Sequence, residues 1–370
     1  MSNKVHIGLI GCGGIANHKH VPSLAAVGED KVVIDAFCDI IPERAASTAA
    51  AAGRPGAATC TDYREILADP SIDTVHVCTP NVSHSEIAVA AFEAGKNVFV
   101  EKPMSHSTEQ ARAMLDAWRA SGRKFTVGYQ NRFRPEVRTL HASCVNGELG
   151  RIYYGEALAV RRRQVPTWGV FPNKSLQGGG PLIDIGTHAL DITLWCMDNY
   201  EVESVLGSVN HELGHLESAA SGNYYGPWDT ETFEVEDSAM GFIKFKNGAT
   251  IVLKASWALN VLDSREASTT LCGTEMGAEI RSGSSYPKDE LIYNGTRHGM
   301  LTHESLSDVS AVAYFEGREE APGVVEAKQW IDAILTDGEP VVRPEQAFRV
   351  TQILDSIYAS AATGKQVFLD

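Results

Sequence analysis

Two adjacent residues, Glu101 and Lys102, directly follow the short apolar run Asn97–Val100. A lysine at the end of a buried strand can donate a hydrogen bond from its ammonium group to an oxygen atom that gains charge during a reaction, and a neighbouring carboxylate can hold that lysine in place. The alternative is an exposed ion pair at a strand end, which is the commoner role for these residue types. Taken alone, the pair leaves both interpretations open.

A second group consists of Asp184 and His188, four positions apart in Gly-Pro-Leu-Ile-Asp-Ile-Gly-Thr-His. If Pro181 occupies the first turn of a helix, the two side chains share one helix face. The dipole at a helix N-terminus stabilises a carboxylate and disfavours an imidazolium, so His188 would serve as a neutral proton acceptor with Asp184 beside it. The alternative is an amphipathic helix whose polar stripe faces water.

A glycine motif of the type Gly-x-Gly-x-x-Ala follows the apolar run Val5–Ile10 at Gly11, Gly13 and Ala16. In such a motif the first glycine permits a tight turn from a strand into a helix. The second lets the backbone approach a pyrophosphate, and a small third residue brings helix and strand together. The motif favours dinucleotide binding, although a glycine-rich turn without a ligand has the same local sequence.

Asp39 stands at the end of a second apolar run, Val32–Cys38. A carboxylate at this place in a dinucleotide-binding fold accepts hydrogen bonds from a ribose 2′-hydroxyl and repels a 2′-phosphate. The next residues, Ile40 and Ile41, offer no cation to such a phosphate. These residues therefore favour NAD over NADP.

The elements that must position these residues are arranged differently in the two parts of the sequence. Short apolar runs alternate with helical segments over the first third of the chain, which predicts a parallel, doubly wound sheet. After Gly128 the sequence becomes rich in strands, and Lys246-Asn247-Gly248 predicts a hairpin turn between two of them. We expect an α/β Rossmann domain over residues 1–128 and an α+β domain over residues 129–370 with a large, mostly antiparallel open sheet.

The expected elements are short strands and longer helices, with a surface loop over residues 211–234. Strands are predicted at Val5–Ile10, Val32–Cys38, Thr74–Cys78, Asn97–Val100, Phe125–Val127, Glu203–Val209, Ser238–Phe245, Thr250–Ala258, Ala267–Leu271 and Leu291–Tyr293. The main helices are predicted at Val82–Ala94, Thr108–Ala120, Pro135–Val145, Pro181–Met197, Val324–Leu335 and Pro344–Ala361.

Charge and composition exclude several classes of protein. The sequence has 32 Lys and Arg against 47 Asp and Glu, a formal net charge of −15, so we expect no nucleic-acid and no membrane partner. The seven cysteines form no Cys-x-x-Cys pair, and no spacing typical of a metal site occurs. Together with the lack of a recognisable export signal, this predicts reduced thiols, no bound metal and a cytoplasmic location.

The motifs taken together resemble the glucose–fructose oxidoreductase, inositol dehydrogenase and rhizopine-catabolism oxidoreductases, the Gfo/Idh/MocA family. The resemblance covers the whole chain in order, and the Glu-Lys-Pro motif combined with the Asp-x-x-x-His helix is far more specific than the glycine motif. It implies a second domain that binds substrate and pairs subunits through its open sheet, as a homodimer or homotetramer. The matching stretches are Ile10–Ala16, Cys78–Asn81 with His84, Ala94–Asn97, Glu101–Pro103, Gly128–Phe133 and Gly178–His188.

The resemblance also implies roles for particular residues. Lys102 is identified as the donor to the reacting oxygen, His188 as the general base, and Asp184 as its neighbour for orientation or substrate binding. A cis Lys102–Pro103 bond is implied as well. For NAD, the cofactor-binding residues that follow are Gly11, Gly13, Gly14, Ile15, Asp39, Thr79, Pro80, Asn81, His84, Glu101, Lys102 and Gln130.

Further substrate contacts are expected from planar and aromatic side chains. Arg163 ends a run of three arginines shortly before Trp168, and the two could supply planar donors and an aromatic platform for a polyol. The alternative for the arginine run is solvated charge or ion pairing. Asn131, directly after the last expected Rossmann strand, completes the substrate-binding set with Asp184 and His188.

The expected activity is oxidation of a secondary ring hydroxyl of a sugar, glycoside or inositol-like cyclitol to a ketone, with hydride transfer to NAD. Two alternatives stay open. One is a glycosidase that uses bound NAD as a transient oxidant, which would release free sugar without net NADH. The other is a non-catalytic NAD-binding regulator of the same fold, although such a protein has no need of Lys102, Asp184 and His188 together.

Overall fold

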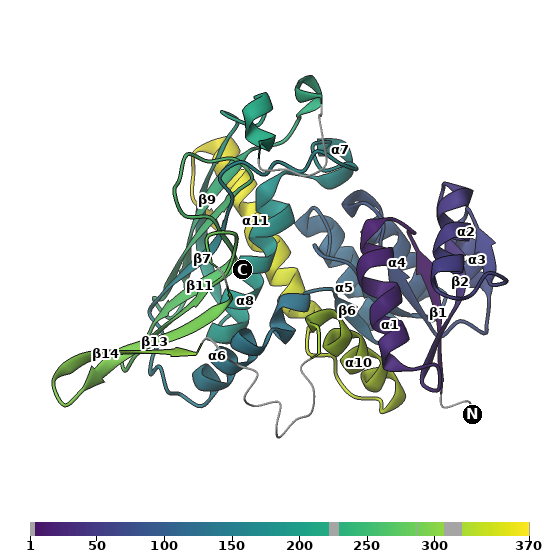
Figure 1. Cartoon of the computed structure of the whole chain (residues 1–370), viewed down its shortest axis with the longest axis horizontal. Helices are drawn as coiled ribbons and strands as arrows, with labels where there is room; N and C mark the ends of the chain where they lie inside the picture. The colour runs from purple at the N-terminus through teal and green to yellow at the C-terminus, as the bar shows by residue number, and fades with distance from the viewer. Residues whose placement is uncertain (1–3, 222–228, 287, 307–319, 370) are drawn as a thin grey trace. The chain divides into compact units, whose positions relative to one another are not determined.

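The computed structural model describes residues 4–221, 229–286, 288–306 and 320–369 (Figure 1). The chain divides into two compact units, each with its own sheet. The first unit comprises Met1–Phe133 and Glu320–Phe348, and the second comprises Arg134–Glu319 and Arg349–Asp370.

A segment from the C-terminal part of the chain belongs to the first unit. Its helix α10 (Pro322–Leu335) contributes Trp330 and Ile331 to the hydrophobic core of that unit. The fully buried Arg132 donates to the carbonyl of Val341 at 3.3 Å and to the side chain of Gln346 at 2.6 Å. The expected division at residues 128/129 treated the domains as continuous, because nothing local in the sequence marks this return.

The sheet of the first unit is parallel at every neighbouring pair, and we call it the parallel sheet. Within the described residues its strands, in spatial order, are β3 (Ala58–Cys60), β2 (Val32–Cys38), β1 (Val5–Ile10), β4 (Thr74–Val77), β5 (Asn97–Val100) and β6 (Phe125–Val127). The strand order reverses direction at the β1–β4 pair, as in dinucleotide-binding folds. The expected Rossmann fold is therefore confirmed.

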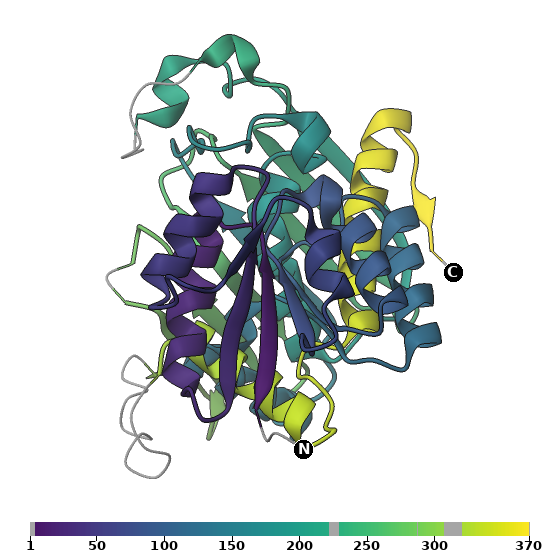
Figure 2. The same cartoon turned by 90° about the vertical axis from the view of Figure 1, so that its right-hand side faces the viewer.

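Helices cover both faces of the parallel sheet (Figure 2). Residues of α1, α2 and α10 form one core with β1 and β2, whereas α4 and α5 pack against each other on the other side. The helices and turns of this unit are η1 (Ala16–His20), α1 (Val21–Val27), α2 (Pro42–Ala51), α3 (Tyr63–Ala68), η2 (Asn81–Ser83), α4 (His84–Glu93), α5 (Thr108–Ser121) and η3 (Gln130–Phe133).

Local sequence explains the bounds of these elements. The strand β1 is buried along almost its whole length, as a strand covered on both faces must be. The helix α5 begins where Ser107 accepts a hydrogen bond from the N–H of Gln110, and it ends at Gly122, whose φ of 64° suits glycine. A serine before a helix and a glycine after it can both be recognised in the sequence as the ends of that helix.

The sheet of the second unit is antiparallel except for the pair β7–β10, and we call it the mixed sheet. Its strands among the described residues, in spatial order, are β14 (Met300–Leu306), β13 (Glu290–Arg297), β12 (Gly277–Arg281), β11 (Arg265–Cys272), β7 (Tyr154–Val160), β10 (Thr250–Ser256), β9 (Ser238–Phe245), β8 (Val202–Asn210) and β15 (Val367–Phe368). The expected open, mostly antiparallel sheet is confirmed, and so is the hairpin turn between β9 and β10.

Helices cover one face of the mixed sheet (Figure 1). Ile357 of α11 lies against Gly207 and Gly241, where any Cβ would approach it within 2.6 Å. The remaining helices and turns of this unit are α6 (Pro135–Val145), α7 (Lys174–Gln177), η4 (Leu182–Gly186), α8 (Thr187–Met197), η5 (Glu217–Ala220), η6 (Thr230–Thr232) and α11 (Pro344–Thr363), and α11 begins in the C-terminal segment of the first unit. Residues 222–228 of the expected surface loop lie outside the described residues.

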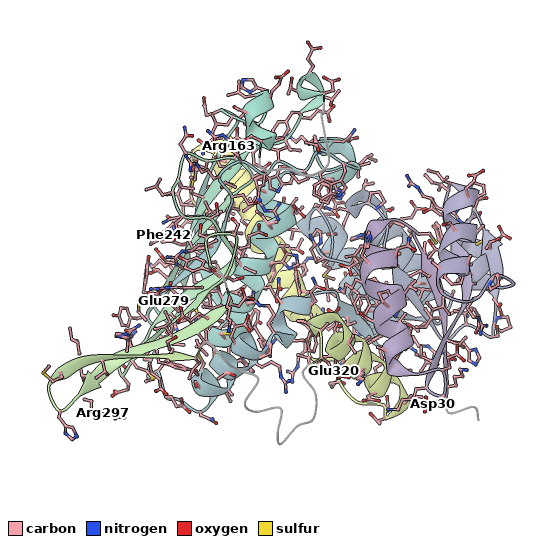
Figure 3. All side chains as sticks on the ribbon, in the orientation of Figure 1. Asp30, Arg163, Phe242, Glu279, Arg297 and Glu320 are labelled. Carbon is pink, nitrogen blue, oxygen red and sulfur yellow. The ribbon has the colours of Figure 1, made fainter. Side chains whose placement is uncertain are left out.

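The opposite face of the mixed sheet carries a continuous row of side chains. The apolar part of this row consists of Leu206, Phe242 and Val252, which are register partners on neighbouring strands and are not buried. Leu206 is 48% exposed and Phe242 is 47% exposed. Figure 3 shows Phe242 and Glu279 pointing away from the helix-covered face. In the described part of the chain, no helix combines the length and apolar character that crossing a membrane requires.

Candidate active site

The expected cofactor residues gather at one edge of the parallel sheet. Gly11–Ile15 follow β1, Asp39 follows β2, Thr79–Asn81 follow β4, and Glu101 follows β5. Gln130 follows β6 at the start of η3. In an open parallel sheet, the carboxyl ends of the strands form the ligand-binding edge, and the crevice lies where the strand order reverses. The structure therefore brings together residues that lie between Gly11 and Gln130 in the sequence.

The glycine loop has the geometry that a pyrophosphate needs. Gly11 has a φ of 90°, and a Cβ there would lie 2.6 Å from the carbonyl carbon and oxygen of Cys78, so only glycine fits. At Gly13, by contrast, a Cβ would have no atom from another part of the chain within 4 Å. The first glycine thus closes the loop onto the neighbouring strand end, and the second leaves its outer side open.

Asp39 is held rigidly at the end of β2. Its Oδ2 accepts a hydrogen bond from the N–H of Cys12 at 2.9 Å, and its Oδ1 accepts one from the N–H of Ile41 at 2.9 Å. Each carboxylate oxygen retains capacity for a further donor such as a ribose hydroxyl. The open side of Gly13 and this fixed carboxylate together fit NAD, because they offer space for a pyrophosphate and an acceptor for the ribose.

His84 supports the loop after β4. The side chain is completely buried, and its ring nitrogens contact the carbonyl oxygens of Pro103 at 2.9 Å and Thr79 at 3.0 Å. Burial lowers its pKa despite these contacts. This buried ring ties the Thr79–Asn81 loop to the cis Lys102–Pro103 segment, and the role of His84 in cofactor binding stays a prediction.

In the second unit, the structure places Asp184 and His188 on one face of a nearly buried helix. Over residues 181–196, all of which are described, only these two side chains are not buried. A solvent-facing polar stripe would also expose Asp191, which is completely buried. Over residues 181–196 the accessible side chains are therefore those of the predicted pair. The helix opens with the π-helical turn η4 before continuing as α8.

Glu236 holds the start of this helix. Its carboxylate accepts hydrogen bonds from the N–H groups of Gly180 at 2.9 Å and Leu182 at 3.1 Å, and from the hydroxyl of Tyr358 at 2.8 Å. These N–H groups belong to the first turn, where helices lack internal partners. Burial raises the pKa of Glu236, although the hydrogen bonds oppose that shift. A Cβ at Gly179 would meet the Tyr358 hydroxyl at 2.1 Å.

Asp184 is oriented by a buried tryptophan. The indole Nε1 of Trp257 donates to Asp184 Oδ2 at 3.1 Å. Phe171 lies edge-to-face against Trp257 with ring centroids 6.3 Å apart, and Trp168 lies 5.5 Å from Phe171. Trp168 itself is 40% exposed. The expected platform residue thus belongs to an aromatic cluster that reaches Asp184.

The arginine run divides into different roles. Arg161 forms a bidentate ion pair with Glu266 at 2.7 and 2.8 Å. Burial alone would lower its pKa, but Glu266 and then Asp184 outweigh burial and raise it. Arg163 donates to the carbonyl of Arg162 at 2.6 Å and to the side chain of Asn260. Asn131 lies half-buried in η3 of the first unit.

Three functional side chains were not singled out from the sequence. Trp257 and Glu236 contact the Asp184 helix, and Lys19 contacts Glu101 at 2.7 Å. A charged lysine just behind a glycine motif is a visible signal, since the first turns of such a helix pack onto the sheet. No local signal indicates Trp257 or Glu236, because each is far from its partner in the sequence.

Comparison with known proteins agrees with this geometry. The family described as "Oxidoreductase family, NAD-binding Rossmann fold" (GFO_IDH_MocA) matches residues 5–129, and the family's C-terminal alpha/beta domain matches residues 142–369. D-glucoside 3-dehydrogenase of Escherichia coli (strain K12) is 33% identical over 370 residues, covering 100% of this chain and 98% of the relative.

Levoglucosan dehydrogenase provides both a sequence and a structural match. The Pseudarthrobacter phenanthrenivorans enzyme is 30% identical over 270 residues, covering 68% of this chain and 67% of the relative. The solved structure of levoglucosan dehydrogenase in complex with NADH and levoglucosan superimposes with a TM-score of 0.81 at 25% identity, covering 99% of both chains.

Proposed function

The chain belongs to the Gfo/Idh/MocA family of NAD-binding oxidoreductases, and on this basis we propose that it is an NAD-dependent dehydrogenase acting on a carbohydrate. The substrate is a sugar, glycoside or cyclitol, and the reaction converts a secondary ring hydroxyl to a ketone. The observation that carries this proposal is the similarity to D-glucoside 3-dehydrogenase along the entire chain. The half-buried Asp184 and His188 support it, because they place a carboxylate and an imidazole at the accessible positions of the otherwise buried residues 181–196.

We propose that Lys102, Asp184 and His188 are the catalytic residues. His188 accepts the proton of the substrate hydroxyl, and Lys102 donates a hydrogen bond to the same oxygen as it becomes a carbonyl oxygen. Asp184, held by Trp257, orients the substrate or the His188 ring. Bound NAD supplies the hydride acceptor. Asn131, Arg163 and Trp168 are proposed as further substrate contacts.

The proposal is tested by NADH formation with a panel of inositols, free hexoses and glycosides. We expect turnover with at least one class, and a loss of about 10²–10⁴-fold in kcat for Lys102→Met and His188→Ala, the range that one acid–base group usually contributes. His215→Ala removes an exposed histidine of the same unit and should keep wild-type kcat. Wild-type turnover in the Lys102 and His188 variants would refute their roles, and sugar release without NADH would indicate the glycosidase alternative.

We also propose that the protein forms a homodimer or homotetramer through the open face of the mixed sheet. Leu206 and Phe242 are register partners, and each exposes nearly half of its surface. A second copy of this chain would present the same apolar row, which is the self-complementary contact that symmetric dimers use. A cytoplasmic location is proposed as well, because the seven free thiols suit a reducing compartment.

A further inference from the structure

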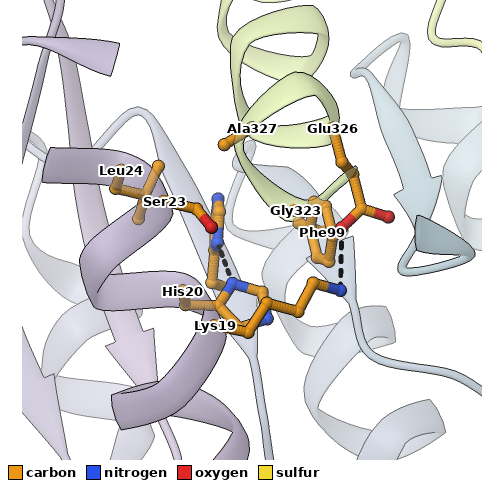
Figure 4. Close-up of a pocket in the computed structure, with 9 residues that line it drawn as sticks. Lys19, His20, Ser23, Leu24, Phe99, Gly323, Glu326 and Ala327 are labelled. Atoms are coloured by element: carbon orange, nitrogen blue, oxygen red, sulfur yellow. Dashed lines mark hydrogen bonds and ion pairs between the residues drawn. The ribbon is translucent and has the colours of Figure 1, made fainter. Parts of the chain in front are cut away.

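A buried ionic cluster surrounds the carboxylate of Glu101 in the first unit. Figure 4 shows three of its members, Lys19, His20 and Glu326, around a pocket. We call the ionic cluster the Lys19 cluster, and it consists of Lys19, His20, His76, Glu101 and Glu326, each at most 9% exposed. All except Glu101 line one small pocket. Lys19 and His20 come from η1, His76 from β4, and Glu326 from α10, so three separate elements converge on the residue that follows β5.

Lys19 is shared between two carboxylates. Its Nζ lies 2.7 Å from Glu101 Oε1 and 2.7 Å from Glu326 Oε2. Burial by itself would lower the pKa of Lys19, but the two carboxylates outweigh it and raise that pKa above its ordinary value. Burial alone would raise the pKa of Glu101, whereas Lys19 and His20 hold it well below its ordinary value. One ammonium thus keeps Glu101 ionised inside the protein.

The two histidines are bound in one tautomeric arrangement. His20 Nε2 lies 2.7 Å from Glu101 Oε1, and since an ionised carboxylate only accepts, this nitrogen carries the proton. Burial lowers the pKa of His20, so its ring is neutral and Nδ1 is an acceptor. That Nδ1 lies 2.9 Å from Nδ1 of His76, which must then be the donor. The cluster is therefore ordered by the charge of Glu101.

The other oxygen of Glu101 faces the segment that carries Lys102. Glu101 Oε2 accepts a hydrogen bond from the backbone N–H of Lys102 at 3.2 Å. A Cβ at Gly128 would lie 3.0 Å from both carboxylate oxygens, so the carboxylate packs directly on the end of β6. The Lys19 cluster on one side and the Lys102 backbone on the other thus share one carboxylate.

We propose that Lys19 is a positioning residue. Its ammonium keeps the Glu101 carboxylate ionised and in contact with the backbone N–H of Lys102. This contact fixes the backbone from which the Lys102 side chain extends. The proposal rests on the proposed function in assigning Lys102 a role in the reaction. Without Lys19, Glu101 and Glu326 would be two buried carboxylates with no ammonium between them, and burial then favours the protonated form of Glu101. The titratable groups facing Glu101 are Lys19 and His20 from η1, His76 from β4, Cys78 directly after β4, His84 from α4, Glu326 from α10 and the adjacent Lys102.

The decisive variant is Lys19→Met, studied by its pH profile. In the wild type, Glu101 stays ionised and adds no acidic limb to kcat/KM. In Lys19→Met, Glu101 becomes protonated as the pH falls, so kcat/KM should drop at least about tenfold more at pH ~6 than at pH ~8 relative to wild type. Lys19→Arg, which keeps a cation for both carboxylates, should restore the wild-type profile.

Lys96→Met is the matched control for removing a buried lysine. Lys96 is 5% exposed and precedes the other end of β5, where its Nζ donates to the carbonyl oxygens of Asp69 and Ile72 at 2.6 and 2.8 Å. This variant should lower the melting temperature without changing the shape of the pH profile. If Lys19→Met does not fold, Lys19→Met/Glu326→Gln removes the second carboxylate. Burial alone then raises the pKa of Glu101, so a shift in the same direction but of smaller size is expected.

A measurement that needs no turnover separates this proposal from the proposed function. In protein labelled with [5-¹³C]glutamate and free of cofactor, the Glu101 signal is identified by its loss in Glu101→Gln. It should stay at the ionised shift in the wild type and titrate at higher pH in Lys19→Met. An unchanged Glu101 titration in Lys19→Met would overturn the proposal even if wild-type activity is found. A shifted titration in a protein without dehydrogenase activity would support the ordering role and refute only the reaction.

Discussion

Three buried carboxylates in this protein have specific partners that compensate their charge. Asp39 has backbone N–H groups on both carboxylate oxygens, and Glu236 accepts two helix N–H groups and a tyrosine hydroxyl. Glu101 relies on a lysine and a histidine. A buried carboxylate without partners costs folding free energy. Each of these carboxylates therefore identifies a place where the protein holds a particular loop or helix start in position.

Cofactor choice is predicted to depend on Asp39. Asp39→Ala combined with Ile40→Arg removes the repulsion of a 2′-phosphate and adds a cation beside it. We expect the ratio of kcat/KM for NADP⁺ to that for NAD⁺ to rise at least about tenfold, which corresponds to ~1.4 kcal/mol. Ile40→Arg alone is the control and should change the ratio less. A ratio that stays at the wild-type value in the double variant would contradict the role of Asp39.

Glu236 is predicted to make stability depend on pH in a definite direction. Burial holds its folded pKa above the unfolded value of about 4.3, so its stabilising contribution is complete below that value and is lost as the pH rises through the folded pKa. Relative to Glu236→Gln, the wild type should therefore lose unfolding free energy as the pH rises from about 4 to 7.

This pH dependence is measured by urea unfolding at several pH values. Glu231→Gln removes an exposed carboxylate from the preceding segment and serves as the control. A difference between wild type and Glu236→Gln that is constant with pH would show that Glu236 has the same pKa in the folded and unfolded states.

At the scale of elements, two helix starts adjoin the candidate site residues. The η1 turn begins behind the glycine loop, and the η4 turn begins under Glu236 and carries Asp184 and His188 onward. Both are π-helical turns that continue directly into α-helices. The glycines that precede these turns differ in their surroundings. A Cβ at Gly180 would lie 2.3 Å from the backbone carbonyl oxygen of Glu236, whereas a Cβ at Gly13 would face open space.

This contrast yields a prediction for the glycine loop. Gly13→Val places a side chain where no protein atom lies within 4 Å, so folding should be unaffected, whereas the space for the pyrophosphate is filled. We expect at least about tenfold weaker NADH binding by fluorescence titration, with a melting temperature within roughly 2 °C of wild type. Gly56→Val, at another open and exposed glycine, should leave NADH binding unchanged. Wild-type affinity in Gly13→Val would place the cofactor elsewhere.

At the scale of the whole molecule, each unit brings distant parts of the chain together. In the first unit, α10 contributes side chains to the hydrophobic core. In the second unit, β15 near the C-terminus is the edge strand of the mixed sheet and pairs with β8. One face of the mixed sheet is covered by helices and the other keeps an apolar row in the open. A large sheet with such a row is typical of a subunit contact.

The oligomer is predicted to depend on this row. Phe242→Arg/Leu206→Arg places two cations on adjacent strands of a self-paired surface, so like charges would meet across the contact. We expect a shift to a smaller species in light scattering coupled to size exclusion. Leu262→Arg, at a leucine that is 90% exposed in the same unit, should keep the wild-type mass. An unchanged mass in the double variant would exclude this face as the interface.

Much of the fold could be predicted because its signals are local. Strands β1, β2, β5, β6 and β9 and helix α6 have the predicted bounds, since apolar runs and turn-forming residues mark these segments. The prediction lacks strands β3, β12, β14 and β15. β14 reads Met-Leu-Thr-His-Glu-Ser-Leu and is mostly exposed, so it lacks the apolar alternation that identifies a strand.

The sequence by itself determined the residues that could carry the chemistry and the strand ends on which the cofactor residues stand, because a strand, a turn and a helix each leave a short-range pattern. Only the tertiary structure decided what surrounds them. Trp257 on Asp184, Glu236 under the helix of His188, and Glu326 beside Lys19 are all contacts across long sequence separations. Such contacts depend on how whole elements pack against one another. A periodic pattern shows which face of an element is packed, but it does not show which distant residue that face meets.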